Sequence, residues 1–224
     1  MYIYLHGFSS GPGSTKARSL QECFAKIGIE LLVPDLNQGD FTHLTVTRQI
    51  EQVVDLLPKD GSPVTLIGSS LGGWISAIIA QEHSQIQQLV LLAPAFDFLH
   101  HWLPKIGDRQ LNSWQNTGYL SIYHHALKDL SPLHYNFLLD ARKYPLSAID
   151  RHLRTLIIHG INDDVIPISA SRNFVRERPW VELLEWESDH QLTDATDSLP
   201  ETLCERIWQE VRRFCQVNGS QTDR

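Results

Sequence analysis

The sequence predicts an α/β fold, in which a mostly parallel six-stranded sheet is flanked by helices. Short, strongly apolar runs alternate along the chain with segments whose apolar residues recur at helical spacing, and this order is typical of such a fold. Strands that are covered by helices on both faces have this composition. The six expected strands are residues 2–6, 29–33, 64–68, 89–93, 155–159 and 181–186.

Helix boundaries are marked by capping residues and by proline. After Ser14, a residue type favoured at helix N-caps, apolar residues recur at helical spacing up to Gly28, which favours a helix end. A second helix is expected over residues 46–57, before Pro58, and a long C-terminal helix over residues 199–214.

One stretch, residues 96–144, breaks the alternation. It is rich in aromatic residues and histidine and contains no clear strand, so we expect a mostly helical, lid-like insertion. Open α/β sheets bind ligands at the carboxyl ends of their strands, and we expect the insertion to lie there. With 224 residues, of which 42% are hydrophobic, the chain is expected to form a single domain, residues 1–224.

The composition argues against several classes of partner. A net charge of −7 does not suit a surface that neutralises phosphates or anionic lipid, so neither nucleic acid nor a membrane is an expected partner. The first residues lack the basic region of a secretory signal, and the apolar stretches are shorter than the ~20 residues that span a bilayer. The three cysteines are widely spaced, without a zinc-binding pattern, which favours a reducing compartment and a cytoplasmic location.

A candidate nucleophile, Ser70, lies in a Gly-x-Ser-x-Gly motif that spans Gly68 to Gly72. An expected strand precedes the motif directly and an expected helix follows it. A serine on so tight a turn projects its Oγ above the sheet, and the strained backbone requires small residues two before and two after. Gly68 and Gly72 are therefore expected to form a nucleophile elbow, whereas Ser69 lacks glycines at these offsets.

A serine hydroxyl needs a base to take its proton, and the base needs an acid to orient it. His190 follows the last expected strand and is the candidate base. Asp163 and Asp164 follow the fifth expected strand and Asp97 follows the fourth, so the residues alone leave the acid open among these three. His159, at a strand end, is expected to play a local structural part.

Two backbone donors are expected to bind the oxyanion that forms during acyl transfer. One is the N–H of Leu71, because it lies at the start of the helix after the nucleophile. The other is the N–H of Phe8, in the turn after the first strand, whose glycines let the backbone approach a substrate closely.

Three segments together resemble the α/β-hydrolase superfamily and, within it, the small bacterial YqiA-like esterases of the UPF0227 type. They are residues 4–14 (YLHGFSSGPGS), 32–36 (LVPDL) and 68–73 (GSSLGG), and the resemblance extends over nearly the whole chain. It implies that Asp163 is the acid and that Phe8 and Leu71 form the oxyanion hole. The chain departs from it in the loop at His190, which lacks the glycine usually found beside that histidine.

These parts predict a serine hydrolase that cleaves a small-molecule carboxylic ester, or a thioester, through an acyl-enzyme on Ser70, with no cofactor and no metal. Ester, thioester and amide substrates remain open, and so does the oligomeric state. The main alternative is a non-catalytic protein that keeps this fold to bind a small molecule or a partner.

Two other interpretations are less well supported. The glycine-rich turn ends in Gly13-Ser14-Thr15-Lys16, whereas a nucleotide-binding loop of the Walker type ends in Gly-Lys-Ser/Thr. The pairs His100-His101 and His124-His125 do not predict a metal site, because neighbours in a helix diverge by ~100°.

Overall fold

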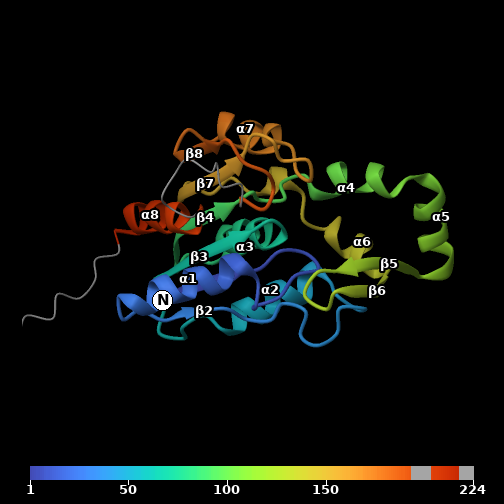
Figure 1. Cartoon of the computed structure of the whole chain (residues 1–224), viewed down its shortest axis with the longest axis horizontal. Coiled ribbons are helices and arrows are strands. Elements are labelled where there is room, and N and C mark those ends of the chain that lie inside the picture. Colours follow the sequence, from blue (N-terminus) through green and yellow to red (C-terminus); the bar gives the residue numbers. More distant parts are fainter. Residues whose placement is uncertain (193–202, 217–224) are drawn as a thin grey trace, which may run out of the picture.

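Six parallel strands form the central sheet, in the order β2-β1-β3-β4-β7-β8 (Figure 1). The structure is a computed structural model, and it describes residues 1–192 and 203–216. The predicted α/β class is confirmed, although the expected strand at residues 29–33 is reduced to two residues at the edge of the sheet. The strands are β1 (Tyr2–Leu5), β2 (Leu31–Leu32), β3 (Val64–Ser69), β4 (Ile86–Leu92), β7 (Arg154–Gly160) and β8 (Val181–Trp186).

Helices cover both faces of the sheet. One face packs against α1 (Thr15–Lys26) and α8 (Leu203–Cys215), and the other against α2 (Val46–Asp55), α3 (Leu71–Glu82) and α7 (Ile168–Arg176). Successive strand residues point to opposite faces, so neighbours such as Leu66 and Ile67 belong to the two different apolar clusters. Ser14 caps α1 as predicted, by accepting from the Ala17 N–H at 3.4 Å. The start of the predicted C-terminal helix, residues 199–202, lies outside the described residues.

The insertion projects to one side of the sheet, on the right in Figure 1. It comprises α4 (Phe98–Ile106), α5 (Asp108–Thr117), β5 (Tyr119–His124), β6 (Asp129–His134) and α6 (Asn136–Ala141), and a short 3-10 helix at Leu146–Ala148 follows it. Backbone carbonyl oxygens of loops that follow strands accept hydrogen bonds from the insertion. Lys105 Nζ donates to the carbonyl oxygen of Val165, after β7, and the N–H of His125 donates to the carbonyl oxygen of Ser9, after β1, at 3.0 and 2.8 Å.

The prediction that this insertion contains no strand is wrong, because β5 and β6 pair as an antiparallel hairpin. In β5 the inward side chains of Leu120, Ile122 and His124 alternate with exposed ones, which is the period of a half-buried strand. Pro132 within β6 and the histidines of both strands hid that period in the sequence, since proline and charged or polar types argue against strands.

The described helices are all too short or too polar to cross a membrane.

Candidate active site

Ser70 lies on a strained turn between β3 and α3. Its backbone has φ 53° and ψ −118°, a conformation that a non-glycine residue rarely adopts. Two hydrogen bonds hold it there: its N–H donates to the Leu92 carbonyl oxygen at 2.9 Å, and its own carbonyl oxygen accepts from the Ala95 N–H at 3.0 Å. The turn therefore has the geometry of a nucleophile elbow, with the strain sustained by β4 and the loop that follows it.

The two glycines of the motif are required by close backbone approach. A Cβ at Gly68 would lie 2.5 Å from Ser76 Oγ, and one at Gly72 would lie 2.6 Å from the carbonyl oxygen of His6. Neither distance leaves room for a methyl group. The helix α3 thus packs directly on β1 and β3, and its first turn points toward Ser70.

Ser70, His190 and Asp163 form a continuous hydrogen-bonded chain. His190 Nε2 lies 3.1 Å from Ser70 Oγ, and His190 Nδ1 lies 2.7 Å from Asp163 Oδ2. A carboxylate accepts only, so Nδ1 carries the proton and Nε2 is left to accept the proton of the Ser70 hydroxyl. The three residues that the sequence singled out come from the ends of β3, β7 and β8, and the fold brings them together.

Asp163 is a buried carboxylate with four donors. Burial alone would raise its pKa, but hydrogen bonds from His159 and His190 and from the Ile166 N–H outweigh it and hold the pKa of Asp163 well below its usual range. Oδ1 accepts from the N–H groups of Val165 and Ile166 at 2.8 and 2.7 Å. These hydrogen bonds therefore favour the ionised form of Asp163, and both of its oxygens have donors.

The other two candidate acids lie elsewhere. Asp164 is exposed, and its contribution near the site is the backbone carbonyl that accepts from Lys105 Nζ at 2.5 Å. Asp97 is exposed at the start of α4, with φ 52°. Among the described residues, Asp163 is the carboxylate that contacts His190.

The two predicted oxyanion donors flank Ser70. Leu71 is the first residue of α3, where N–H groups have no partner within the helix. The turn before Phe8 approaches from the other side, since a Cβ at Gly7 would lie 3.2 Å from Ser70 Cβ. The backbone that carries each predicted donor thus lies next to Ser70: Leu71 follows it in the chain, and Gly7 precedes Phe8.

His6 orients the peptide that carries the Phe8 N–H, a function that the sequence analysis missed. Its Nδ1 donates to the Gly7 carbonyl oxygen at 2.9 Å, and its Nε2 accepts from the Leu36 N–H at 3.0 Å. Because the C=O and N–H of one planar peptide point in opposite directions, holding the Gly7 carbonyl also aims the Phe8 N–H. Burial lowers the pKa of His6, which suits the neutral ring that these two bonds require.

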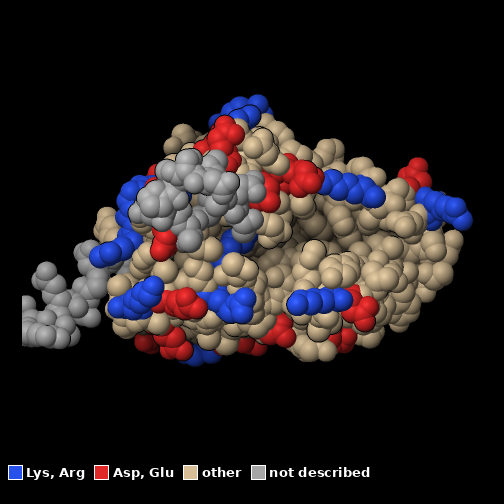
Figure 2. All heavy atoms as spheres, viewed as in Figure 1, with Lys and Arg blue, Asp and Glu red and all other residues tan. Residues whose placement is uncertain are grey.

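Aromatic side chains of the insertion pack around Phe8. Its ring centroid lies 5.4 Å from that of Trp102, 5.9 Å from Phe98 and 5.3 Å from Phe137. Figure 2 shows a hollow on this side of the molecule, between the regions of α4 and the β5-β6 hairpin, with charged side chains at its rim and few inside. The turn that packs against Ser70 through Gly7 therefore continues, at Phe8, into an apolar and aromatic cluster.

The loop that carries His190 lies against Gly160, the last residue of β7. A Cβ at Gly160 would collide with the carbonyl oxygens of Ser188 and Asp189. Lys16 Nζ, at the buried side, donates to the carbonyl oxygen of Gln191 at 2.9 Å. The absence of a side chain at Gly160 thus makes room for the loop that carries His190.

Gly160→Ala is expected to displace His190 and to lower kcat/KM for an ester substrate by about 100-fold, because a shift of about 1 Å in a catalytic group costs that much. The thermal midpoint is expected to fall as well. Gly13→Ala is the matched control, since a Cβ at Gly13 has no atom within 4 Å among the described residues. Equal activities of the two variants would contradict the close packing of the loop on β7.

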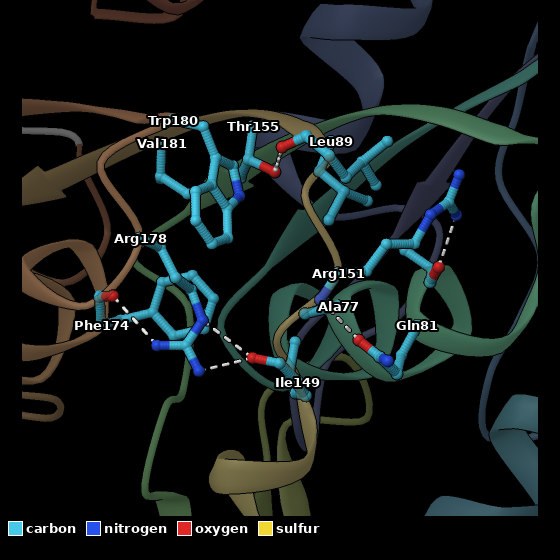
Figure 3. Close-up of a pocket in the computed structure, with 12 residues that line it drawn as sticks. Ala77, Gln81, Leu89, Ile149, Arg151, Thr155, Phe174, Arg178, Trp180 and Val181 are labelled. Carbon is cyan, nitrogen blue, oxygen red and sulfur yellow. Dashed lines mark hydrogen bonds between the residues drawn. The ribbon is translucent and has the colours of Figure 1, made fainter.

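A separate cavity lies at the opposite end of the sheet, beside the amino ends of β7 and β8 (Figure 3). Two arginines, Arg178 and Arg151, line it, and both guanidinium groups donate hydrogen bonds to backbone carbonyl oxygens. Arg178 donates to Ile149 and Phe174. Arg151 donates to Ala80, His83 and Ser84. These arginines clamp the chain between α6 and β7, and they have no contact with Ser70.

The histidine pairs of the insertion have local contacts. His100 and His101 contact each other, with ring centroids 5.1 Å apart, and His124 is buried against Phe41 at 4.7 Å. Over residues 1–192 and 203–216, no group of three or more His, Cys, Asp or Glu side chains is placed to hold a metal ion.

Known proteins of similar sequence and structure are α/β-fold hydrolases. The chain is 26% identical over 212 residues to the palmitoyl-protein thioesterase ABHD10, mitochondrial, of Mus musculus, with 87% of this chain and 70% of that protein covered. A solved structure from Agrobacterium vitis S4 superposes with a TM-score of 0.80 at 26% identity, covering 95% of this chain and 86% of that one. Est1E from Butyrivibrio proteoclasticus, solved with ferulic acid bound, gives 0.75 at 20% identity, covering 96% and 89%. The model of the uncharacterised protein family UPF0227 matches residues 1–204, and the chain therefore belongs to that family.

Proposed function

We propose that this protein is a serine hydrolase that cleaves a carboxylic ester or a thioester through an acyl-enzyme on Ser70. The observation that carries the proposal is the hydrogen-bonded chain from Ser70 through His190 to Asp163, at 3.1 and 2.7 Å. These distances are those of a nucleophile that is activated by a base, with the base oriented by a third group.

In the first half of the reaction, Ser70 Oγ attacks the acyl carbon while His190 Nε2 takes the hydroxyl proton. The imidazolium that forms is stabilised by the ionised Asp163, which does not itself take a proton. The oxyanion accepts hydrogen bonds from the N–H groups of Phe8 and Leu71, and the N-terminal end of α3 adds its positive dipole.

Departure of the leaving group completes the first half of the reaction, and attack by water in the second half regenerates the serine. His190 Nε2 gives its proton to the leaving alcohol or thiol as the tetrahedral intermediate collapses, which leaves the acyl group on Ser70 Oγ. In the second half, a water molecule attacks the acyl carbon and gives its proton to His190. The bond from the acyl carbon to Ser70 Oγ then breaks, His190 gives that proton to Oγ, and the acid is released. All proton transfers pass through one nitrogen, so His190 has to stay aligned throughout.

The substrate is proposed to carry an apolar acyl group. The aromatic cluster formed by Phe8, Phe98, Trp102 and Phe137 beside the nucleophile supports this, and it offers no charged partner to a polar acyl chain. The name of the mouse relative, a palmitoyl-protein thioesterase, is consistent with an apolar acyl group, and Est1E was solved with ferulic acid, which has an aromatic ring, bound to it. A cytoplasmic location stays a prediction from the sequence, and the mouse relative is named as mitochondrial.

A fluorophosphonate probe tests the proposal, because it reacts only with a serine whose hydroxyl is activated. We expect an adduct on Ser70, located by peptide mass spectrometry, and no adduct in His190→Ala. Thermal unfolding of both proteins checks that the variant is folded. Native, folded protein that takes up no probe would support a non-catalytic binding protein instead.

A further inference from the structure

A second histidine contacts the carboxylate of the proposed triad. His159 Nε2 lies 3.0 Å from Asp163 Oδ2, the same oxygen that accepts from His190 Nδ1 at 2.7 Å. Its other nitrogen, Nδ1, lies 2.7 Å from Ser171 Oγ on α7. The catalytic mechanism derived above does not use either His159 or Ser171.

The contacts of His159 fix where its protons lie. Nε2 faces two acceptors, the Asp163 carboxylate and the Ile166 carbonyl oxygen, the latter at 3.0 Å, so Nε2 carries a proton. In the neutral ring Nδ1 then accepts, and the Ser171 hydroxyl is its donor. Loss of that hydroxyl would leave Nδ1 without its donor, while the two acceptors at Nε2 would still favour this tautomer.

The arrangement of Ser171, His159 and Asp163 repeats the order of a catalytic triad, but it is not a second active site. Both Ser171 and His159 are fully buried, with 0% exposure, so no substrate reaches the Ser171 hydroxyl. Its effect on the reaction has to pass through Asp163.

We propose that His159 is a positioning residue for the hydrolytic reaction: its N–H holds the Asp163 carboxylate toward His190 and reduces its attraction for the proton of that ring. The inference rests on the proposed function. A carboxylate oxygen that accepts two donors is less basic than one that accepts a single donor, so the imidazolium of His190 is stabilised less. The hydrogen bond from His159 therefore favours the neutral form of His190, which is the form that acts as a base, compared with a protein in which Asp163 lacked this donor.

Other charged groups near this pair are unchanged in the comparison below. Among the described residues they are Lys16, whose Nζ donates to the Gln191 carbonyl oxygen, the neighbouring Asp189, and Glu185, which lies opposite His159 on β8 and is paired with Arg172. Their contributions to the proton affinity of His190 are common to wild type and variants, so differences between the proteins report the hydrogen bond to Asp163.

The test compares His159→Leu, which removes the donor, with His159→Gln, whose side-chain amide keeps an N–H at the position of Nε2. We expect the acidic limb of the pH profile of kcat/KM to move up by about half a unit or more in His159→Leu, since one pKa unit corresponds to ~1.4 kcal/mol and this bond is charge-assisted. At its optimum, kcat is expected to fall about tenfold, part of the 10²–10⁴ that a general base supplies, with KM unchanged. His159→Gln is expected to restore both.

Ser171→Ala is a second variant that leaves His159 in place. Ser171→Ala is expected to move the acidic limb of the kcat/KM profile upward, but by less than His159→Leu does. Combined with His159→Leu it is expected to cause no further shift, because both changes act through the hydrogen bond from His159 to Asp163. Ser188→Ala is the matched control: Ser188 is also fully buried, and its hydroxyl has no hydrogen-bond partner among the described residues.

An NMR titration of His190 in the Ser70→Ala background is expected to show the same upward movement of the His190 midpoint in the absence of turnover. If His159→Leu fails to fold, the same titration of Ser171→Ala tests the inference instead. If His159→Leu lost activity by the same factor at every pH and the titration midpoint of His190 did not change, His159 would have only a structural role. Probe labelling of wild type and of the His159 and Ser171 variants that retain Ser70 separates the two ideas. Label without a shift overturns this inference alone, whereas no label on the wild type overturns the proposed function.

Discussion

Ser70→Ala is expected to lower kcat for ester hydrolysis by roughly 10⁶-fold, the typical cost of losing a triad serine. Without Oγ there is no acyl acceptor, and His190 Nε2 loses the hydroxyl that lies 3.1 Å away. The residual rate comes from the oxyanion donors and from substrate binding, which act on water in place of serine. Initial rates with an activated ester, such as a p-nitrophenyl ester, measure the effect.

Ser69→Ala provides the matched control for this variant. Ser69 is the preceding residue, buried at the end of β3, and its side chain points away from the reaction because successive strand residues alternate. It is expected to keep turnover within about tenfold of wild type, with Ser70→Ala folded to the same extent by circular dichroism. Turnover of Ser70→Ala close to that of wild type would mean that another residue is the nucleophile.

Asp163→Asn is expected to lower kcat by about 10⁴-fold while leaving the fold intact. The amide nitrogen of asparagine is a donor, so it opposes the N–H of His190 Nδ1 and favours the other tautomer, in which Nε2 carries the proton and cannot accept from Ser70. Asp164→Asn is the matched control, since that side chain is exposed. Equal losses in the two variants would show that His190 is not oriented by Asp163.

The free energy of unfolding of Asp163→Asn and that of Asp164→Asn are also expected to depend differently on pH. The pKa of Asp163 is lower in the folded protein than in the unfolded chain, so its ionised form stabilises the fold at pH values above about 3.9, the unfolded pKa, and this contribution is lost as the pH falls through the folded pKa. The free energy of unfolding, from urea titrations, is expected to fall between pH 6 and pH 3 by more in wild type and Asp164→Asn than in Asp163→Asn.

The nucleophile turn was predictable from sequence because its requirements are local. A strand, Gly68, Ser70, Gly72 and a helix in immediate succession leave little freedom, and the structure has that order. The acid was harder to identify, since Asp163 and Asp164 follow the same strand. Their difference, one carboxylate buried with four donors and the other exposed, arises from the turn of the chain and from His190, which is distant in sequence.

Single histidines carried too little signal to predict what His6 and His159 contact. Each lies at or just after the end of a strand, a common place for a polar residue, and one partner of each ring is more distant in sequence: Leu36 for His6, and Ser171 on α7 for His159. The hairpin of the insertion was missed for a related reason. Its strands pair with each other rather than with the main sheet, so their period was the only evidence for them, and Pro132 interrupts it.

Because the site residues are far apart along the chain, the recovery of activity is expected to report a late step of folding. Ser70 and His190 are 120 residues apart, and their strands, β3 and β8, are separated in the sheet by β4 and β7. The contact between them closes a very long loop and forms only after three parallel pairings are complete, which are slow steps. In a refolding experiment, the helical circular dichroism signal is therefore expected to return before turnover does. The time at which turnover recovers is expected to mark the pairing of β8 with β7.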